Sequence, residues 1–254
     1  MSLKRLRPAA LGLACQLWMT PCAAGEVVVA VAANFTAAMQ KLAPQFEQQT
    51  GHKAVASYGS TGKLATQIQN GAPFEVLLAA DDETPAKLER STHAVTGSRF
   101  TYAVGQLVLW SREPGRVDGD GGVLRGDSFE RLAIADPRLA PYGAAAVQTL
   151  RSLGLYDRLQ PRLVTGENIT QAHQFVATGN AQLGFVALSQ VQADGRIAEG
   201  SAWVVPAHLH EPIVQQAVLL TKGRDSAAAA ALLQFLRSEP ARTVIRGAGY
   251  SLPP

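Results

Sequence analysis

Residues 26–51 read EVVVAVAANFTAAMQKLAPQFEQQTG and contain both kinds of element from which the fold is built. The run Glu26–Ala32 is apolar without alternation, which is typical of a strand buried on both faces of a sheet. After it, apolar side chains recur at spacings of four, three and four from Phe35 to Phe46. This spacing predicts an amphipathic helix, and Gly51 is suited to end it as a left-handed cap.

The same alternation of strand and helix continues to the end of the chain. Further strands are expected at Val55–Ser57, Phe74–Ala79, Val104–Trp110, Leu132–Ala135, Arg162–Val164, Leu183–Val186 and Ile213–Leu220. Helices are expected around Leu64–Ile68, from Asp81 or Asp82 onward, and at Tyr142–Leu153, Ile169–Ala177, Ala227–Leu236 and Ala241–Ile245. Strands alternating with helices of about ten residues favour mainly parallel sheets covered by helices, so the sequence predicts an α/β fold.

The first 24 residues have the composition of a secretory signal peptide. Three basic residues within the first seven positions precede the apolar run Pro8–Met19, and small residues follow up to Ala24. The apolar run is shorter than the roughly 20 residues that span a bilayer. We therefore expect cleavage near Ala24 and export of the remaining chain.

Removal of this leader would change the net charge and the cysteine content of the remaining chain. Both cysteines, Cys15 and Cys22, lie within it, so the exported chain would have no disulfide. The residues before Cys15 loosely resemble a lipoprotein processing site, but the short apolar stretch argues against a lipid tether there. The full chain has 23 Lys+Arg and 20 Asp+Glu, and removing the three basic leader residues leaves 20 of each. A net charge of zero gives no argument for a nucleic-acid or membrane-surface partner.

The 230 residues after position 24 are enough for one large or two modest domains. Two lobes made from one chain need segments that cross between them. The long runs Phe100–Trp110 and Ile213–Leu220 are the candidates. The stretch Glu113–Asp127, rich in Gly and Asp, is interpreted as a surface excursion.

Small polar or donor-rich steps occur at four places where a predicted strand gives way to a helix. Ligands of open α/β sheets bind at the carboxyl ends of strands, where helix N-termini offer unpaired N–H groups and a positive dipole end. If several such ends meet, they form an oxyanion site without any cationic side chain. Taken singly, each step also fits an ordinary helix cap or, for the tyrosine, a core aromatic. The steps are Ala33-Asn34, Gly59-Ser60-Thr61-Gly62, Pro141-Tyr142-Gly143 and Glu167-Asn168-Ile169.

Patterns typical of enzymes are scarce in the sequence. His208 and His210 could ligate a metal, but no further ligands stand at a suitable spacing. Neither a nucleophile elbow nor a P-loop occurs. The pair Asp81-Asp82, beside Pro85, is better interpreted as a charged helix start. We therefore expect a protein that is not an enzyme and has no cofactor or bare metal cation.

Several motifs in order along the chain resemble the periplasmic molybdate-binding proteins of bacterial ABC importers. The matching stretches are AVAANFTAAMQKLAPQFEQQTGH (30–52), SYGSTGKLATQIQNGAPFEVLLAADDETPAKL (57–88), SRFTYAVGQLVLWS (98–111), ADPRLAPYGAAAVQTLRSLGL (135–155), LGFVAL (183–188), EPIVQQAVLL (211–220) and GAGYSLP (247–253). The resemblance covers essentially the whole chain after the leader. Its most specific parts are the entry to the first helix, the G-S-T-G turn and the D-P-x-x-A-P-Y-G segment.

The resemblance implies a two-lobed type II periplasmic binding protein fold, in which each lobe is a mainly parallel sheet flanked by helices. Lobe 1 would comprise 25–102 and 206–254, and lobe 2 would comprise 103–205. A molybdate or tungstate ion would lie between the lobes. The protein would be a monomer in the periplasm and would deliver the ion to the membrane permease of its ABC transporter. Carried over by position, the ligand residues are Asn34, Thr61, Tyr142 and the amide of Ile169, with Ala33, Ser60 and Asn168 as weaker candidates.

Two positions depart from parts of the family. Some members have a hydroxyl residue where Asn34 stands, which puts the side-chain role of Asn34 in doubt but not that of its backbone amide. Others have a ligand tyrosine at the position of Ala187, so here Tyr142 must supply the phenol. None of the matched positions is acidic, which suits a fully deprotonated dianion, although Glu167 is adjacent.

Other functions remain open at this point. A receptor for sulfate or another tetrahedral oxyanion would differ mainly in the size of its ion. An exported hydrolase on the same fold would need an acid, base or nucleophile in the cleft. A transcriptional effector domain fits the leader peptide poorly.

Overall fold

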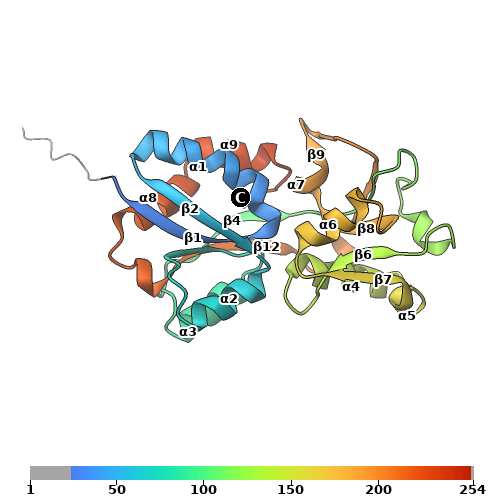
Figure 1. The fold of residues 1–254 in the computed structure, drawn as a ribbon, viewed down its shortest axis with the longest axis horizontal. Coiled ribbons are helices and arrows are strands. Elements are labelled where there is room, and N and C mark those ends of the chain that lie inside the picture. The colour runs from blue at the N-terminus through green and yellow to red at the C-terminus, as the bar shows by residue number, and fades with distance from the viewer. Residues whose placement is uncertain (1–23, 253–254) are drawn as a thin grey trace, which may run out of the picture.

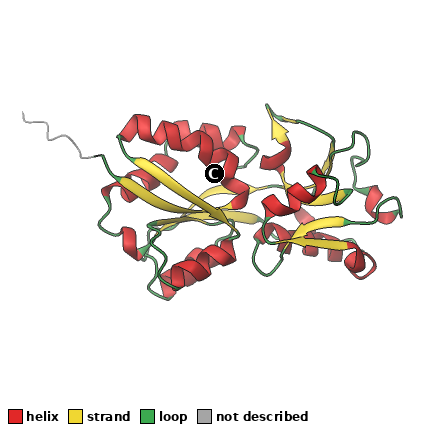
Figure 2. Cartoon of the chain, viewed as in Figure 1, coloured by secondary structure: helices red, strands yellow, loops and turns green. Residues whose placement is uncertain are grey.

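Two five-stranded β-sheets, each flanked by helices, organise the chain into two halves (Figures 1 and 2). The structure is a computed structural model that describes residues 24–252. Residues 1–23 of the predicted signal peptide, with Cys15 and Cys22, lie outside the described residues. Within residues 24–252, no helix combines the length and apolar character needed to cross a membrane. The predicted α/β class is confirmed.

The first sheet has the strand order β2-β1-β3-β12-β4. Because β12 is antiparallel to both of its neighbours, the other four strands run in one direction. Alternate side chains of β1 reach different cores, with Val29 packed among α1, α8 and α9 and Ala30 packed with α2 and α3. Helices therefore cover both faces. The elements are β1 (Glu26–Ala32), β2 (Lys53–Gly59), β3 (Val76–Leu78), β4 (Phe100–Gly105), β12 (Ile213–Leu219), α1 (Thr36–Thr50), α2 (Thr61–Gln69), α3 (Glu83–Arg90), α8 (Ala227–Leu236) and α9 (Glu239–Gly247).

The second sheet repeats this topology in the order β11-β5-β8-β6-β7. Here β5 is antiparallel to both neighbours, and the other four strands share one direction. The predicted mainly parallel sheets are thus found in both halves. The elements are β5 (Leu107–Ser111), β6 (Leu132–Ala135), β7 (Leu163–Gly166), β8 (Leu183–Ala187), β11 (Ser201–Val204), α4 (Pro141–Ser152), α5 (Tyr156–Leu159), α6 (Ile169–Ala177) and α7 (Leu188–Val191).

The chain passes between the sheets twice, and the sequence located only one passage correctly. The predicted single strand Val104–Trp110 is wrong, because β4 ends at Gly105 in the first sheet and β5 begins at Leu107 in the second. The crossover expected within Phe100–Trp110 therefore lies at Gln106. The crossover expected at Ile213–Leu220 is misplaced, since β12 pairs only with strands of the first sheet. That passage lies at 205–212, between β11 and β12, and the proposed lobe boundaries remain predictions.

Short elements were not predicted because they lack the length for a periodic pattern. These are β11, α5, α7, the hairpin β9 (Gln192–Ala193) and β10 (Arg196–Ile197), and the 3-10 helices η1 (Ala33–Phe35), η2 (Gly122–Arg125), η3 (Gln160–Arg162), η4 (Ala207–Leu209) and η5 (Thr221–Gly223). The expected excursion Glu113–Asp127 contains η2 and buries Leu124 in the second core. Gly51 adopts φ 73° and ends α1, as its position in the sequence predicted.

We expect Gly143→Ala to destabilise the second half of the protein. A Cβ at this position in α4 would lie 2.2 Å from the backbone oxygen of Ala135 at the end of β6. Because a backbone atom cannot rotate away, overpacking should lower the free energy of unfolding by about 1–3 kcal/mol. Urea denaturation measures this. Gly119→Ala is the control, because a Cβ there meets nothing within 4 Å; equal stabilities of the two variants would contradict the packing argument.

Candidate anion-binding site

Four helices begin around one small cavity between the two sheets. Two of them, η1 and α2, follow β1 and β2 of the first sheet, and the other two, α4 and α6, follow β6 and β7 of the second. The cavity measures about 10 Å³. All seven predicted ligand residues line it, although their roles as ligands remain predictions. The complete lining is Ala32, Ala33, Asn34, Gly59, Ser60, Thr61, Ala80, Ala140, Pro141, Tyr142, Asn168 and Ile169.

The lining has no Asp, Glu, Lys, Arg or His side chain and is rich in hydrogen-bond donors. N–H groups in the first turn of a helix have no partner within that helix. Within the described chain, the amides of Thr61, Tyr142 and Ile169 form no loop or cap hydrogen bond to the backbone either. The four helix dipoles also place their positive ends at this point. The cavity is therefore electrostatically suited to an anion.

Three hydroxyl groups line the cavity, and they differ in their hydrogen-bond partners. Thr61 Oγ1 accepts a hydrogen bond from the amide of Ala80 at 3.0 Å. Tyr142 Oη accepts one from Gln215 Nε2 at 3.2 Å. Ser60 Oγ is buried and has no partner among the described residues. A buried polar group without a partner costs free energy, so Ser60 is a group that a ligand could satisfy.

The two asparagines differ in what their side chains do. Asn168 Oδ1 accepts from the amide of Gln171 at 3.1 Å, so Asn168 caps α6 and orients its first turn. The Asn34 side chain caps no helix and donates instead to Gln215 Oε1 at 2.9 Å and to Tyr250 Oη at 3.0 Å. The cap interpretation is thus right for Asn168 and wrong for Asn34. With both hydrogens of its amide donated elsewhere, Asn34 can serve a ligand through its backbone only.

The sequence analysis missed the residues behind the cavity. Gln215, Tyr102, Tyr250 and Ser189 are buried and join Asn34 and Tyr142 in one hydrogen-bonded network. One signal was available, since Gln215 and its neighbour Gln216 interrupt the apolar run of β12. A buried glutamine in such a strand requires partners, and that requirement points to a polar network.

Direct contacts hold the two halves together beside the cavity. The amide of Gly62 donates to the carbonyl of Leu139 at 2.9 Å. Ser189 Oγ donates to the carbonyl of Asn34 at 3.0 Å. Lys63 Nζ lies 2.5 Å from Glu167 Oε1. Glu167 is therefore paired with a lysine and is not part of the lining, although a half-exposed ion pair contributes little to stability.

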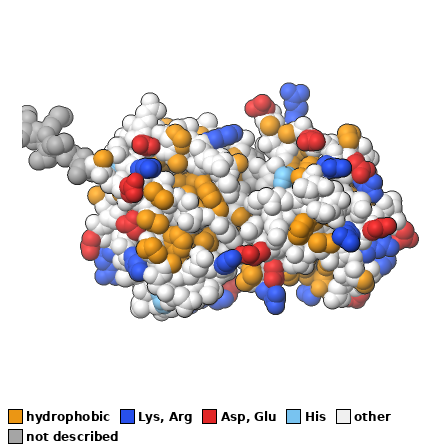
Figure 3. Space-filling model, viewed as in Figure 1, with side chains coloured by type: hydrophobic (Ala, Val, Ile, Leu, Met, Phe, Trp, Pro, Cys, Tyr) orange, Lys and Arg blue, Asp and Glu red, His pale blue; other side chains and the backbone are white. Residues whose placement is uncertain are grey.

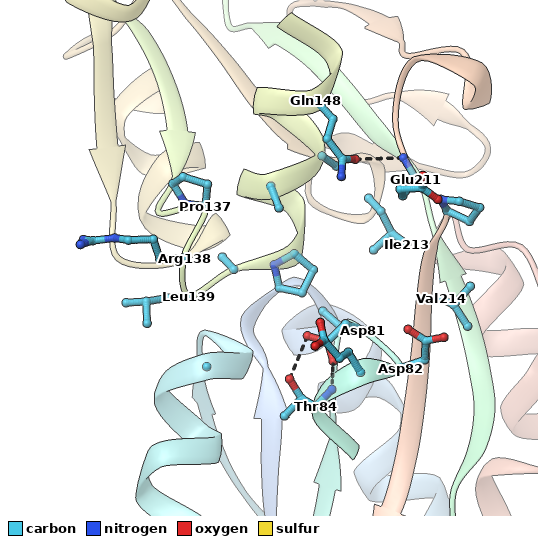
Figure 4. Close-up of a pocket in the computed structure, with 18 of the residues that line it drawn as sticks. Asp81, Asp82, Thr84, Pro137, Arg138, Leu139, Gln148, Glu211, Ile213 and Val214 are labelled. Carbon is cyan, nitrogen blue, oxygen red and sulfur yellow. Dashed lines mark hydrogen bonds between the residues drawn. The ribbon is translucent and has the colours of Figure 1, made fainter. Parts of the chain in front are cut away.

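A larger hollow of about 350 Å³ lies near the second crossover (Figure 4). Four carboxylates (Asp81, Asp82, Glu83 and Glu211) line it against two cations (Lys87 and Arg138), and this excess of negative charge makes it less suited to a dianion. Asp81 accepts from the amide of Thr84 at 2.8 Å and from its hydroxyl at 3.1 Å, so it fixes the start of α3 as expected. Burial raises the pKa of Asp81. Within residues 24–252, no group of three His, Cys, Asp or Glu side chains could hold a metal ion.

Comparison with known proteins decides the family. The family of bacterial extracellular solute-binding proteins matches residues 27–251. The chain belongs to this family. The molybdate-binding protein ModA of Azotobacter vinelandii is 61% identical over 229 residues, which cover 90% of this chain and 91% of that protein. ModA of Rhodobacter capsulatus is 51% identical over 246 residues, 96% of each chain.

A solved structure supports the same placement of this solute-binding protein. The periplasmic molybdate-binding protein of Azotobacter vinelandii superposes with a TM-score of 0.87 at 46% identity, covering 90% of this chain and 100% of that one. The resemblance drawn from the sequence motifs is thereby confirmed. The expected two-lobed binding-protein fold is confirmed with it.

Three buried tyrosines of this solute-binding protein should make its stability fall at high pH. Burial raises the pKa of Tyr102, Tyr142 and Tyr250 above the usual value. The unfolded chain loses these protons near pH 10 while the folded chain keeps them. The contribution of these tyrosines to the free energy of unfolding is therefore unchanged below about pH 10. Above that pH, each tyrosine lowers the free energy of unfolding by up to about 1.4 kcal/mol per pH unit. Urea unfolding at several alkaline pH values measures the slope. Tyr102→Phe should make it shallower, and an unchanged slope would contradict the assignment.

Proposed function

We propose that this protein captures molybdate or tungstate in the periplasm and passes it to the permease of an ABC importer. The observation that carries the proposal is the uncharged, donor-rich cavity at which four helix N-termini from both sheets meet. Relatives that are 61% and 51% identical are named molybdate-binding proteins. The ligand set is proposed to be the amides of Asn34 and Ile169 with the hydroxyls of Thr61 and Tyr142, while Ala33, Ser60 and Asn168 complete the lining.

The chemistry of the ion fits this lining. Molybdate is a dianion without a proton near neutral pH, so it only accepts hydrogen bonds. A protonated oxyanion such as hydrogen phosphate also needs an acceptor, and the lining has no carboxylate. A hydrogen bond to a charged group contributes roughly 1.5–3 kcal/mol. About five to seven of them can account for roughly 8–12 kcal/mol of binding free energy after the costs of association.

Binding must involve some movement of the two halves. The cavity of about 10 Å³ has about the room that one water molecule requires. A tetrahedral ion with four oxygens is larger, so the contacts between Gly62 and Leu139 and between Lys63 and Glu167 would separate to admit it. Reclosure then excludes water and strengthens each hydrogen bond to the ion.

The remaining parts of the proposal follow from this role. The ion is carried and not transformed, so no acid, base or nucleophile is required at the cavity. The leader predicted at 1–24 would place the protein in the periplasm, and we propose that it acts there as a monomer. Acidic and basic side chains are interspersed on the face seen in Figure 3, which offers no single-sign patch for nucleic acid. Sulfate remains the alternative ligand to be tested against molybdate.

Titration calorimetry of residues 25–254 tests the ligand and its donors. We expect one-to-one binding of molybdate and tungstate, with sulfate and phosphate at least about a thousandfold weaker, or about 4 kcal/mol. Thr61→Ala and Tyr142→Phe should each weaken molybdate binding by about 10–100-fold, because each removes a charge-assisted hydrogen bond. Tyr156→Phe, at a tyrosine on α5 away from the cavity, is the matched control. Equal affinity for sulfate and molybdate would sink the assignment.

Ser60→Ala separates binding from stability. Because Ser60 Oγ is buried without a partner, its removal should leave the ligand-free protein unchanged or raise its free energy of unfolding by about 1 kcal/mol. The same change should weaken molybdate binding if the ion satisfies this hydroxyl. Thermal unfolding with and without molybdate measures both effects. A variant destabilised without the ion and unchanged in affinity would show that Ser60 is structural.

A further inference from the structure

Gln215 lies at the centre of the buried network behind the cavity. Its side chain is fully buried in β12. Its oxygen accepts from Asn34 Nδ2 at 2.9 Å and lies 3.1 Å from the hydroxyl of Tyr102. Its nitrogen donates to the hydroxyl oxygen of Tyr142 at 3.2 Å. Gln215 thus connects the interior of the first half to a tyrosine of the second half that lines the cavity.

The direction of these hydrogen bonds is set jointly by the amides of Asn34 and Gln215. Its Nδ2 atom contacts two oxygens, one from Gln215 and one from Tyr250. An amide nitrogen has two hydrogens to donate, and both are used here. If the Gln215 amide were reversed, two NH₂ groups would face each other without an acceptor. With Asn34 oriented in this way, the NH₂ group of Gln215 faces Tyr142.

This arrangement determines what Tyr142 can offer to a ligand. Its oxygen already accepts a hydrogen bond from Gln215, with the Asn34 side chain as a second donor beside it, and no acceptor for its own hydrogen is found among residues 24–252. Burial raises the pKa of Tyr142 well above the usual value, so the hydroxyl keeps its hydrogen at neutral pH. Thr61 is in a similar state, because its oxygen accepts from the amide of Ala80. Both hydroxyls are left with a hydrogen to donate toward the cavity.

The chain backbone leaves space for this pair. A Cβ on Gly105, at the first crossover, would lie 2.1 Å from Tyr142 Oη and 2.7 Å from Gln215 Nε2. Only a glycine allows β4 to pass so close to both groups. The contact between Gln215 and Tyr142 is therefore supported by the main chain at the point where the two halves join.

We propose that Gln215 is a positioning residue that makes the Tyr142 hydroxyl a donor only, so that this hydroxyl favours fully deprotonated oxyanions. The inference rests on the proposed oxyanion function and adds a residue that determines specificity without touching the ion. A protonated oxyanion must donate its hydrogen to something. With the oxygen of Tyr142 occupied by Gln215, this hydroxyl cannot accept that hydrogen.

The test is Gln215→Met, which keeps the length of the side chain and removes its donor and acceptor. Molybdate and hydrogen phosphate are titrated separately into the protein comprising residues 25–254. Molybdate binding should weaken while phosphate binding does not, because the freed Tyr142 oxygen can then accept. The ratio of the two affinities should fall by at least about tenfold, equivalent to about 1.4 kcal/mol. A purely structural role of Gln215 would weaken both ions together and leave the ratio unchanged, which would overturn the inference.

A double-mutant cycle shows whether Gln215 acts through Tyr142. In the Tyr142→Phe background, Gln215→Met should change the affinity ratio by less than about twofold, because coupled residues are not additive. Additive effects would overturn the inference. Gln216→Met is the control on the same strand, since the Gln216 side chain contacts Arg99 and Thr101 and not the network. It should leave the ratio unchanged.

Two further outcomes are distinguishable. If Gln215→Met does not fold, Gln215→Glu takes its place, because a carboxyl group still accepts from Asn34 and draws the Tyr142 hydrogen away from the cavity. The ratio should fall in this variant too, and an unchanged ratio would count against the inference. Wild-type protein that binds neither molybdate nor tungstate would overturn the proposed function and this inference with it. If the wild-type protein binds molybdate but the variants keep the wild-type ratio of molybdate to phosphate affinity, only the inference about Gln215 is overturned.

Discussion

Four helix N-termini from two separate sheets have to meet at one point, and much of the structure follows from that constraint. Each of these helices starts at the carboxyl end of a parallel strand, so the carboxyl ends of both sheets must face one another. Close approach there depends on small residues. Gly62 donates to the backbone of Leu139 across the gap, and a Cβ on Gly62 would lie 3.1 Å from Leu139 Cα. A dianion can then be met by backbone donors from both halves without a cationic side chain.

The two crossovers explain why each sheet contains one reversed strand. In the second sheet the antiparallel strand is β5, which the chain enters directly after the first crossover at Gln106. In the first sheet it is β12, which follows the second crossover at 205–212. Both reversed strands therefore lead away from the junction between the halves. The same geometry pairs Gln215 of β12 with Ala103 of β4 and brings its side chain beside Gly105 and, across the junction, beside Tyr142.

Local sequence carries the α/β alternation but not the places where the chain changes sheet. Strands such as β1 and helices such as α6 were predictable because apolar periodicity and glycine caps are local signals. The break at Gln106 was not, since apolar residues continue on both sides of it. The misplacement of the second crossover has a similar cause, because the run Ile213–Leu220 has the composition of an ordinary strand. Which sheet a strand joins is decided by partners distant in the sequence.

The candidate site shows the same division between local and distant information. The steps at Asn34, Thr61, Tyr142 and Ile169 were recognisable because a strand end followed by a helix start is a local pattern, and the structure gathers them around one cavity. The function of the Asn34 side chain was not recognisable, because its partners Gln215 and Tyr250 lie 181 and 216 residues further along the chain.

A neutral polar network behind the cavity is costly to bury, so its persistence requires a physical reason. An apolar core of equal volume would avoid the desolvation of Asn34, Gln215 and the tyrosines, and would be at least as stable. Apolar side chains, however, would leave the Tyr142 hydroxyl free to rotate and to act as either donor or acceptor. The network removes that freedom before any ligand arrives, so the orientation is fixed during folding and not during binding. Its members come from β4, β12, η1, α4, α7 and Tyr250 near the C-terminus, so the donor character of one hydroxyl depends on the correct assembly of both halves.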